Sequence, residues 1–150
     1  MKNIKPELVR LFKEGYCTPQ IARIARTIDE PSATIHYNIK KLENDGAIRT
    51  YKAVFDYEKI DEGFCAYVLI ALSAGEYCTP ERLAVDLAKN KEVESVDIIS
   101  GDWELIVKIR TKDQDEYYNF LRSVISGKTG LQKAISMISL KQIKTEFVLL

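Results

Sequence analysis

The sequence predicts an α+β protein, in which an N-terminal helix-turn-helix domain of winged-helix-like type precedes a ferredoxin-like β-α-β-β-α-β domain. Two observations predict this class. Apolar residues recur at helical spacing in three short stretches of the first 46 residues, as in a small helical domain. Strand-like and helical stretches then follow one another in the ferredoxin-like order. We therefore expect a helix-turn-helix domain over residues 1–46, an extended hinge strand and linker over 47–62, and the ferredoxin-like domain over 63–150.

The first two helices are predicted from a proline and an apolar stripe in each. Pro6 suits the first position of a helix and Gly15 ends that helix. Its stripe consists of Leu8, Leu11 and Phe12. Thr18 is the expected N-cap of the second helix, with Pro19 at its first position. The second stripe consists of Ile21, Ile24, Ala25 and Ile28.

A third helix is expected over residues 32–44, because Pro31 interrupts the second helix and Gly46 supplies a C-cap. Its inward face carries Ile35, Ile39 and Leu42. The stretch that follows, residues 47–55, is rich in β-branched and aromatic residues and is predicted to be extended.

The second domain is predicted to hold four strands and two helices. The strands are expected over residues 64–73, 93–100, 103–111 and 133–144. The first helix is expected over 79–90, capped by Thr79 with Pro80 at its first position. Gly101 and Asp102 indicate a tight hairpin turn between the two middle strands. The second helix is expected over 113–126, with a core face of Tyr117, Phe120, Leu121 and Val124.

The strands also predict a dimer. Trp103, Leu105, Val107 and Ile109 alternate onto one face of their strand, whereas Ile106 lies on the other. Two helices cover only one side of a four-stranded sheet, so the second apolar side needs another cover. A partner subunit laid on that face makes the protein a homodimer.

Charge is unevenly distributed along a chain whose 22 basic and 22 acidic residues balance. Residues 1–55 hold ten Lys/Arg and six Asp/Glu, a net of +4, and the remaining residues carry −4. A basic first half fits a partner such as double-stranded DNA.

The third predicted helix carries the residue types that read bases and hold phosphates. Arg23 and Arg26 of the second helix could also neutralise phosphates. The alternative is a solvated helix face whose lysines only aid solubility. The DNA-binding residues we expect are Ser32, Ala33, His36, Tyr37, Lys40, Lys41, Arg49 and Lys52.

Other kinds of site are not expected. Cys17, Cys65 and Cys78 lack C-x-x-C spacing and, with the single His36, cannot complete a zinc set. We expect reduced thiols, no metal, no cofactor and no enzymatic activity. The Gly-Lys-Thr of residues 127–129 resembles a P-loop, but Arg122 stands where the first glycine of that motif belongs. A polar N-terminus indicates no signal peptide, so a cytoplasmic protein with no membrane partner is expected.

Three segments resemble the Lrp/AsnC family of leucine-responsive, or feast/famine, regulators. Residues 34–48 are similar to the family's recognition-helix signature, 100–104 to its Gly-Asp-Tyr-Asp turn, and 130–131 to its Gly-Val strand entry. The resemblance implies a DNA-binding domain, a regulatory domain, dimers that assemble into octamers, and amino-acid effectors bound where dimers meet. Asn38 stands where the family commonly has arginine, and Ala134 replaces a frequent threonine. The effector-binding residues implied are Gly101, Asp102, Trp103, Glu104 and Ser136.

The hypothesis that results is a sequence-specific DNA-binding transcriptional regulator modulated by a small amino-acid-type effector between its C-terminal domains. Two alternatives stay open: an enzyme on the same scaffold, similar to the siroheme decarboxylases, and an effector-sensing protein without specific DNA binding. For Gly101 and Asp102, a plain hairpin turn is the alternative to an effector site.

Overall fold

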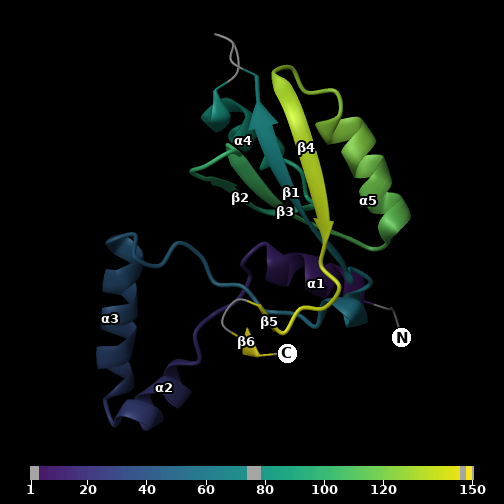
Figure 1. Cartoon of the computed structure of the whole chain (residues 1–150). Coiled ribbons are helices and arrows are strands. Elements are labelled where there is room, and N and C mark those ends of the chain that lie inside the picture. Colours follow the sequence, from purple (N-terminus) through teal and green to yellow (C-terminus); the bar gives the residue numbers. More distant parts are fainter. Residues whose placement is uncertain (1–3, 74–78, 146–147, 150) are drawn as a thin grey trace. The chain divides into compact units, whose positions relative to one another are not determined.

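The computed structural model describes residues 4–73, 79–145 and 148–149, and the chain forms two compact units, residues 1–54 and 55–150 (Figure 1). The first unit contains three helices: α1 (Lys5–Lys13), α2 (Ile21–Ile28) and α3 (Ser32–Asn44). Their order and type match the predicted helix-turn-helix series. The third has the predicted bounds.

One glycine and one helix C-cap explain how the chain turns after the first two helices. A Cβ at Gly15, which has φ +95°, would lie 2.6 Å from Oγ1 of Thr50, so the turn after α1 requires glycine. Asp29 ends α2 in the left-handed conformation, with its N–H donating to the carbonyl of Ala25. The predicted cap at Thr18 is wrong: the N-cap of α2 is Gln20, because a turn precedes the helix.

Residues 47–56 contain no helix or strand. A strand needs a neighbouring backbone to pair with, and none of the strands that the structure describes pairs with this segment. Its first residues are attached to α3 instead. The N–H of Ile48 donates to the carbonyl of Leu42, and the hydroxyl of Tyr51 donates to Oε1 of Glu43 at 3.1 Å.

The second unit contains the predicted ferredoxin-like sheet. A short 3₁₀ helix, η1 (Tyr57–Ile60), leads into β1 (Phe64–Leu72), α4 (Pro80–Leu87), β2 (Val93–Ile98) and β3 (Leu105–Thr111). Helix α5 (Gln114–Phe120) continues through a π-helical turn, η2 (Leu121–Ile125), to β4 (Leu131–Ile138). The antiparallel strands lie in the order β2-β3-β1-β4. The predicted fold class is therefore confirmed.

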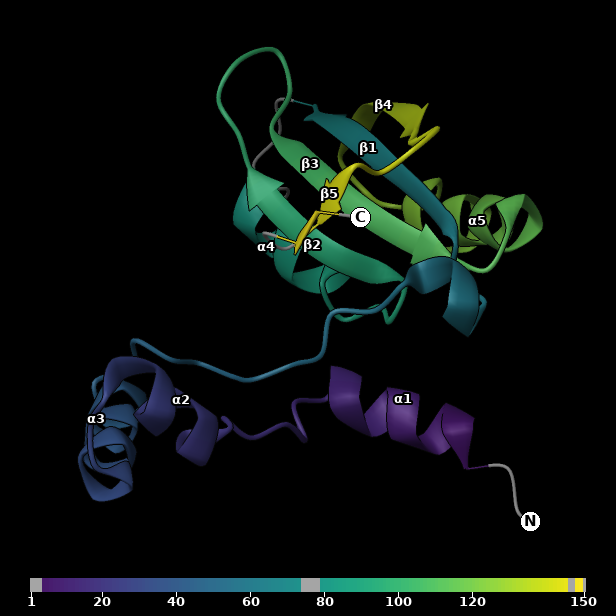
Figure 2. The ribbon, with the colours of Figure 1, turned by 90° about the horizontal axis from the view of Figure 1, so that it is seen from below.

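Both long helices of this unit lie on one face of the sheet, and the core lies between (Figure 2). Val68 of β1 is opposite Val107 of β3, and both are fully buried with their neighbours on that face. The π turn carries Ile125 into this core, whereas Leu121 and Val124 are only partly buried. The predicted core face is confirmed, since Leu121 and Val124 pack against the core that contains the buried Tyr117 and Phe120. The prediction lacked only Ile125, which the π turn adds.

The four predicted strands are all longer than the real ones, the first by a single residue. The loop of residues 99–104, not a tight turn, joins β2 to β3. The N–H of Ile99 donates to the carbonyl of Glu104 across this loop, and the N–H of Glu104 donates to the carbonyl of Ile70 in β1. Strand β4 ends at Ile138, where it pairs with Ala66 near the start of β1. Farther on, β5 (Lys144–Thr145) pairs with β6 (Val148–Leu149) in a separate two-stranded sheet.

The second face of the four-stranded sheet carries apolar side chains that neither α4 nor α5 covers. Alternation places Tyr67 and Leu69 of β1 on this face, with Ile106 of β3 opposite Leu69. Ile135 and Met137 of β4 pair with the same two residues of β1 and are 38% and 42% exposed. We call these five residues the open sheet face.

Candidate nucleic-acid interface and ligand-binding loop

The outward side of α3 presents a mixed polar and aromatic surface. Ile35 is buried and Ile39 is half-buried, which turns the other side of the helix toward solvent. Tyr37 is 69% exposed on this side. Leu42, expected to face inward, is 46% exposed. The predicted DNA-binding residues of α3 are all exposed: Ser32, Ala33, His36, Tyr37, Lys40 and Lys41.

The basic side chains of the first unit differ in the contacts that they make within the protein. Nζ of Lys40 lies 2.6 Å from Oε2 of Glu43, one turn along α3. The hydrogen bond and charge of Glu43 raise the pKa of Lys40, and those of Lys40 in turn lower the pKa of Glu43. Lys40 is thus already paired with a carboxylate of the same helix, which the sequence prediction missed although the i, i+3 spacing signals it.

The remaining predicted basic residues, Lys41, Arg49 and Lys52, are exposed. Arg23 of α2 is exposed as well, while Nε of Arg26 donates to the carbonyl of Ala22 at 3.2 Å. Cationic side chains at the surface of the protein are accessible to the phosphates of a duplex.

Asn38, which stands in place of a common family arginine, does not present its amide for base reading. Its Nδ2 donates to the carbonyl of Thr34 at 2.8 Å, so the side chain folds back on its own helix.

The second candidate site is the loop of residues 99–104. Gly101 has φ +116°, and a Cβ there would meet no atom within 4 Å. Asp102 beside it is exposed. Glu104 is engaged, because one oxygen of its carboxylate accepts the N–H of Leu72 at 2.9 Å. The loop therefore offers an open backbone turn next to a solvent-exposed carboxylate.

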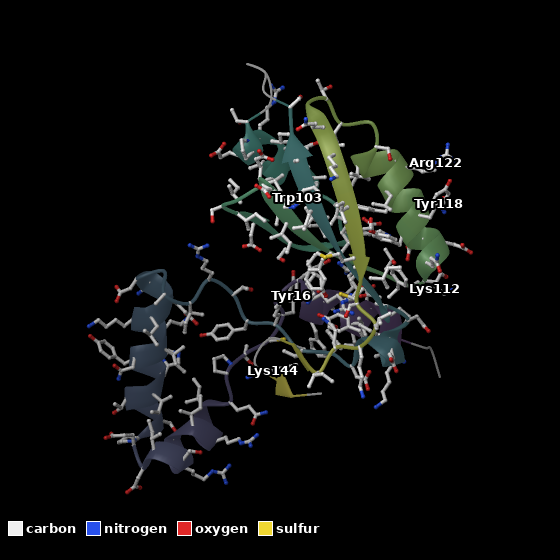
Figure 3. All side chains as sticks on the ribbon, in the orientation of Figure 1. Tyr16, Trp103, Lys112, Tyr118, Arg122 and Lys144 are labelled. Carbon is white, nitrogen blue, oxygen red and sulfur yellow. The ribbon has the colours of Figure 1, made fainter. Side chains whose placement is uncertain are left out.

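Trp103 belongs to this loop and not to β3, so the prediction that it shares a strand with Leu105, Val107 and Ile109 is wrong. Its side chain, labelled in Figure 3, is half-buried. Nζ of Lys133 lies 5.2 Å from the ring centroid. Lys133 is opposite Ala71 near the start of β4, on the same face of the sheet as Ile135 and Met137. The sequence prediction did not include Lys133.

Ser136, the hydroxyl implied by the resemblance, lies on the other side of β4. It is opposite Val68, on the face that α4 and α5 cover, and its Oγ accepts the hydroxyl hydrogen of Tyr117 at 2.6 Å. The structure thus groups Gly101, Asp102 and Trp103 in one loop with Lys133 nearby, but gives Ser136 a partner in the core.

Other sites considered from the sequence have structural explanations. Lys128 of the P-loop-like segment forms an ion pair with Asp86 of α4. Cys17 and Cys65 are free thiols, and Cys78 lies outside the described residues. Within residues 4–73 and 79–145, no three His, Cys, Asp or Glu side chains are grouped to hold a metal ion. In that same part of the chain, no helix has the length and apolarity to span a membrane.

Comparison with known proteins identifies the family. Residues 65–149, more than half of the chain, match the Lrp/AsnC ligand binding domain. The chain belongs to the Lrp/AsnC family. It is 31% identical over 141 residues to the HTH-type transcriptional regulator FL11 of Pyrococcus horikoshii, covering 94% of this chain and 90% of that one. The DNA-binding transcriptional activator DecR of Escherichia coli is 25% identical over 96% of this chain and 94% of its own.

Solved structures of this family have the same fold. An AsnC family transcriptional regulator from Agrobacterium tumefaciens has a TM-score of 0.75 at 22% identity, covering 97% of this chain and 94% of its own. A transcriptional regulator from Neisseria meningitidis, solved as a complex with L-Met, has a TM-score of 0.75 at 20% identity, covering 97% and 93%. These relatives are regulators, not enzymes. This Lrp/AsnC protein is a DNA-binding transcriptional regulator.

Proposed function

We propose that this Lrp/AsnC protein binds a palindromic DNA site as a homodimer and changes its assembly when an amino acid binds between its C-terminal domains. The exposed side of α3 carries the first part of the proposal. Its hydroxyl, imidazole and phenol groups can reach base edges in a major groove, while Lys41, Arg49 and Lys52 hold phosphates. Two copies related by a dyad would present two such helices.

The open sheet face supports the homodimer. Its five side chains form an apolar surface on the side of the sheet opposite α4 and α5. A stable interface needs about 800 Å² from each partner. A four-stranded sheet laid on its copy offers an area of that order, and it would remove these side chains from water.

Octamers, as four such dimers, would bring the loops of residues 99–104 together where dimers meet. An effector in that position can change assembly only by binding one state better than another. The relative from Neisseria meningitidis bound to L-Met supports an amino acid as the effector. We place the protein in the cytoplasm, where such a regulator meets its DNA.

The deciding experiment is selection of bound sequences from random duplexes, with and without each amino acid. We expect a two-fold symmetric motif whose half-sites lie about one helical turn, or a multiple, apart. An amino acid that acts as the effector should change the spacing or the occupancy. Recovery of unselected sequences at every round would instead favour an effector-sensing protein without specific DNA binding, and a mobility-shift assay would check that result.

A further inference from the structure

We propose that Lys133 is the residue of the effector site that binds the free carboxylate of the amino acid. This inference rests on the proposed function, because it assumes that the loop of residues 99–104 receives the effector. It adds a residue from a different element, β4, and the chemical group of the ligand that this residue contacts.

The first observation is that Lys133 has a defined position without an anionic partner. Its ammonium lies 5.2 Å from the centroid of the Trp103 ring. Cation–π contact holds the ammonium close to the ring. Among the residues that the structure describes, Lys133 forms no ion pair, whereas Lys40, Lys108 and Lys128 each pair with a carboxylate.

The second observation is that Lys133 and the loop are anchored at the same end of β1. Lys133 is opposite Ala71, and the next residue, Leu72, donates its N–H to the carboxylate of Glu104. The N–H of Glu104 donates to the carbonyl of Ile70. Three consecutive residues of β1 therefore hold both the cation and the loop in place.

The third observation is that the groups around this corner complement a zwitterion. Asp102 is exposed and can accept hydrogen bonds from an ammonium, and Gly101 leaves open space at its backbone. Lys133 supplies the cation that the carboxylate of the zwitterion needs. Glu104 cannot serve the ammonium as freely, because the N–H of Leu72 already occupies one of its oxygens.

The test uses the full-length protein and isothermal titration calorimetry with each of the twenty standard amino acids. Trp103 is the single tryptophan of the chain, so its fluorescence reports directly on this corner. The amino acid that binds most tightly is then compared with its own carboxamide, which keeps the ammonium and side chain but lacks the carboxylate charge. Lys133→Met keeps an apolar chain against Trp103, Lys133→Arg keeps the charge, and Lys91→Met is a matched loss of one lysine elsewhere in the unit.

We expect Lys133→Met to weaken binding by about 10- to 100-fold, as for a lost hydrogen bond to a charged group. Lys133→Arg and Lys91→Met should bind within about threefold of the wild type, and the carboxamide should bind the wild type as weakly as the amino acid binds Lys133→Met. Wild-type affinity in a folded Lys133→Met, or equal affinity for the carboxamide, would overturn the inference and leave the proposed function standing. If no amino acid binds the wild type, the effector function fails and this inference fails with it.

Discussion

Nε of Arg110 donates a hydrogen bond to Oε1 of Glu94 at 2.5 Å, although the side chain of Arg110 is only 4% exposed. The guanidinium also donates to Oε1 of Gln142 at 2.7 Å and lies 3.6 Å from the ring centroid of Tyr57. One buried cation therefore connects strand β3 to β2, to the segment after β4, and to η1 before β1. A buried charge is tolerated only with such a set of partners.

Replacing Arg110 by methionine should lower the free energy of unfolding by about 2–3 kcal/mol, because Glu94 and Gln142 lose a buried donor. The loss should be smaller than for a fully buried pair, since Lys108 still lies 2.8 Å from Glu94. Urea denaturation measures it. Lys91→Met, an exposed lysine, is the control and should change the value by less than about 0.5 kcal/mol. A stability equal to wild type would show that these contacts add nothing.

The same pair predicts a pH dependence. Burial alone would raise the pKa of Glu94, but hydrogen bonds from Arg110 and Lys108 outweigh it and hold this pKa below its usual value. The unfolded chain then binds a proton at higher pH than the folded one. The stabilisation is complete above the unfolded pKa of about 4.3 and is lost as the pH falls through the folded value. Unfolding free energies of wild type and Glu94→Gln should therefore converge as the pH falls below about 4.3; parallel curves would contradict this.

Removing two lysines of α3 tests their contact with phosphate. The double variant Lys40→Ala and Lys41→Ala should weaken binding to all duplexes alike. It should also lower the slope of log affinity against log salt by about two, near 0.9 per phosphate contact. A salt titration by fluorescence anisotropy measures the slope. An unchanged slope would remove both lysines from the interface.

Glu43 should oppose DNA binding, because it occupies the ammonium of Lys40 and accepts the hydroxyl of Tyr51. The variant Glu43→Gln removes the negative charge that holds the ammonium of Lys40. The amide oxygen of the new glutamine can still accept the hydroxyl of Tyr51. We expect an affinity gain of about three- to fivefold at low salt, which shrinks as salt increases. Glu14→Gln, at the acidic C-cap of α1 in the same unit, is the matched control for net charge. An equal gain in both variants would reduce the effect to overall charge.

The open sheet face predicts where a dimer breaks. Ile106→Asp places a carboxylate among apolar side chains, so the proposed interface would have to bury an unpaired charge. We expect a monomer by sedimentation equilibrium at micromolar concentration. Val85→Asp, which changes an exposed valine of α4 in the same way, should stay dimeric. A dimeric Ile106→Asp would place the interface on another surface.

Local signals predicted most of this fold, and the misses have physical causes. Thr79 caps α4 by accepting the N–H of Arg82, as its position before Pro80 predicts. Bounds were wrong where pairing with another strand decides them, as at Ile98, the last residue of β2 that pairs with β3. The same contrast between local signals and distant contacts holds for the predicted site residues. Exposure on α3 follows from helical periodicity, but the pairing of Trp103 with Lys133 depends on strand order, which spacing along the chain does not encode.

The strand that follows the linker is β1, and it lies in the middle of the sheet, between β3 and β4. A force applied through the linker would therefore act along two ladders of hydrogen bonds. Many hydrogen bonds would share this force and would have to break together. An edge strand joined only to one neighbour would share the same force among fewer bonds. Mechanical strain from the linker should thus displace this domain as a rigid body before it unravels the sheet.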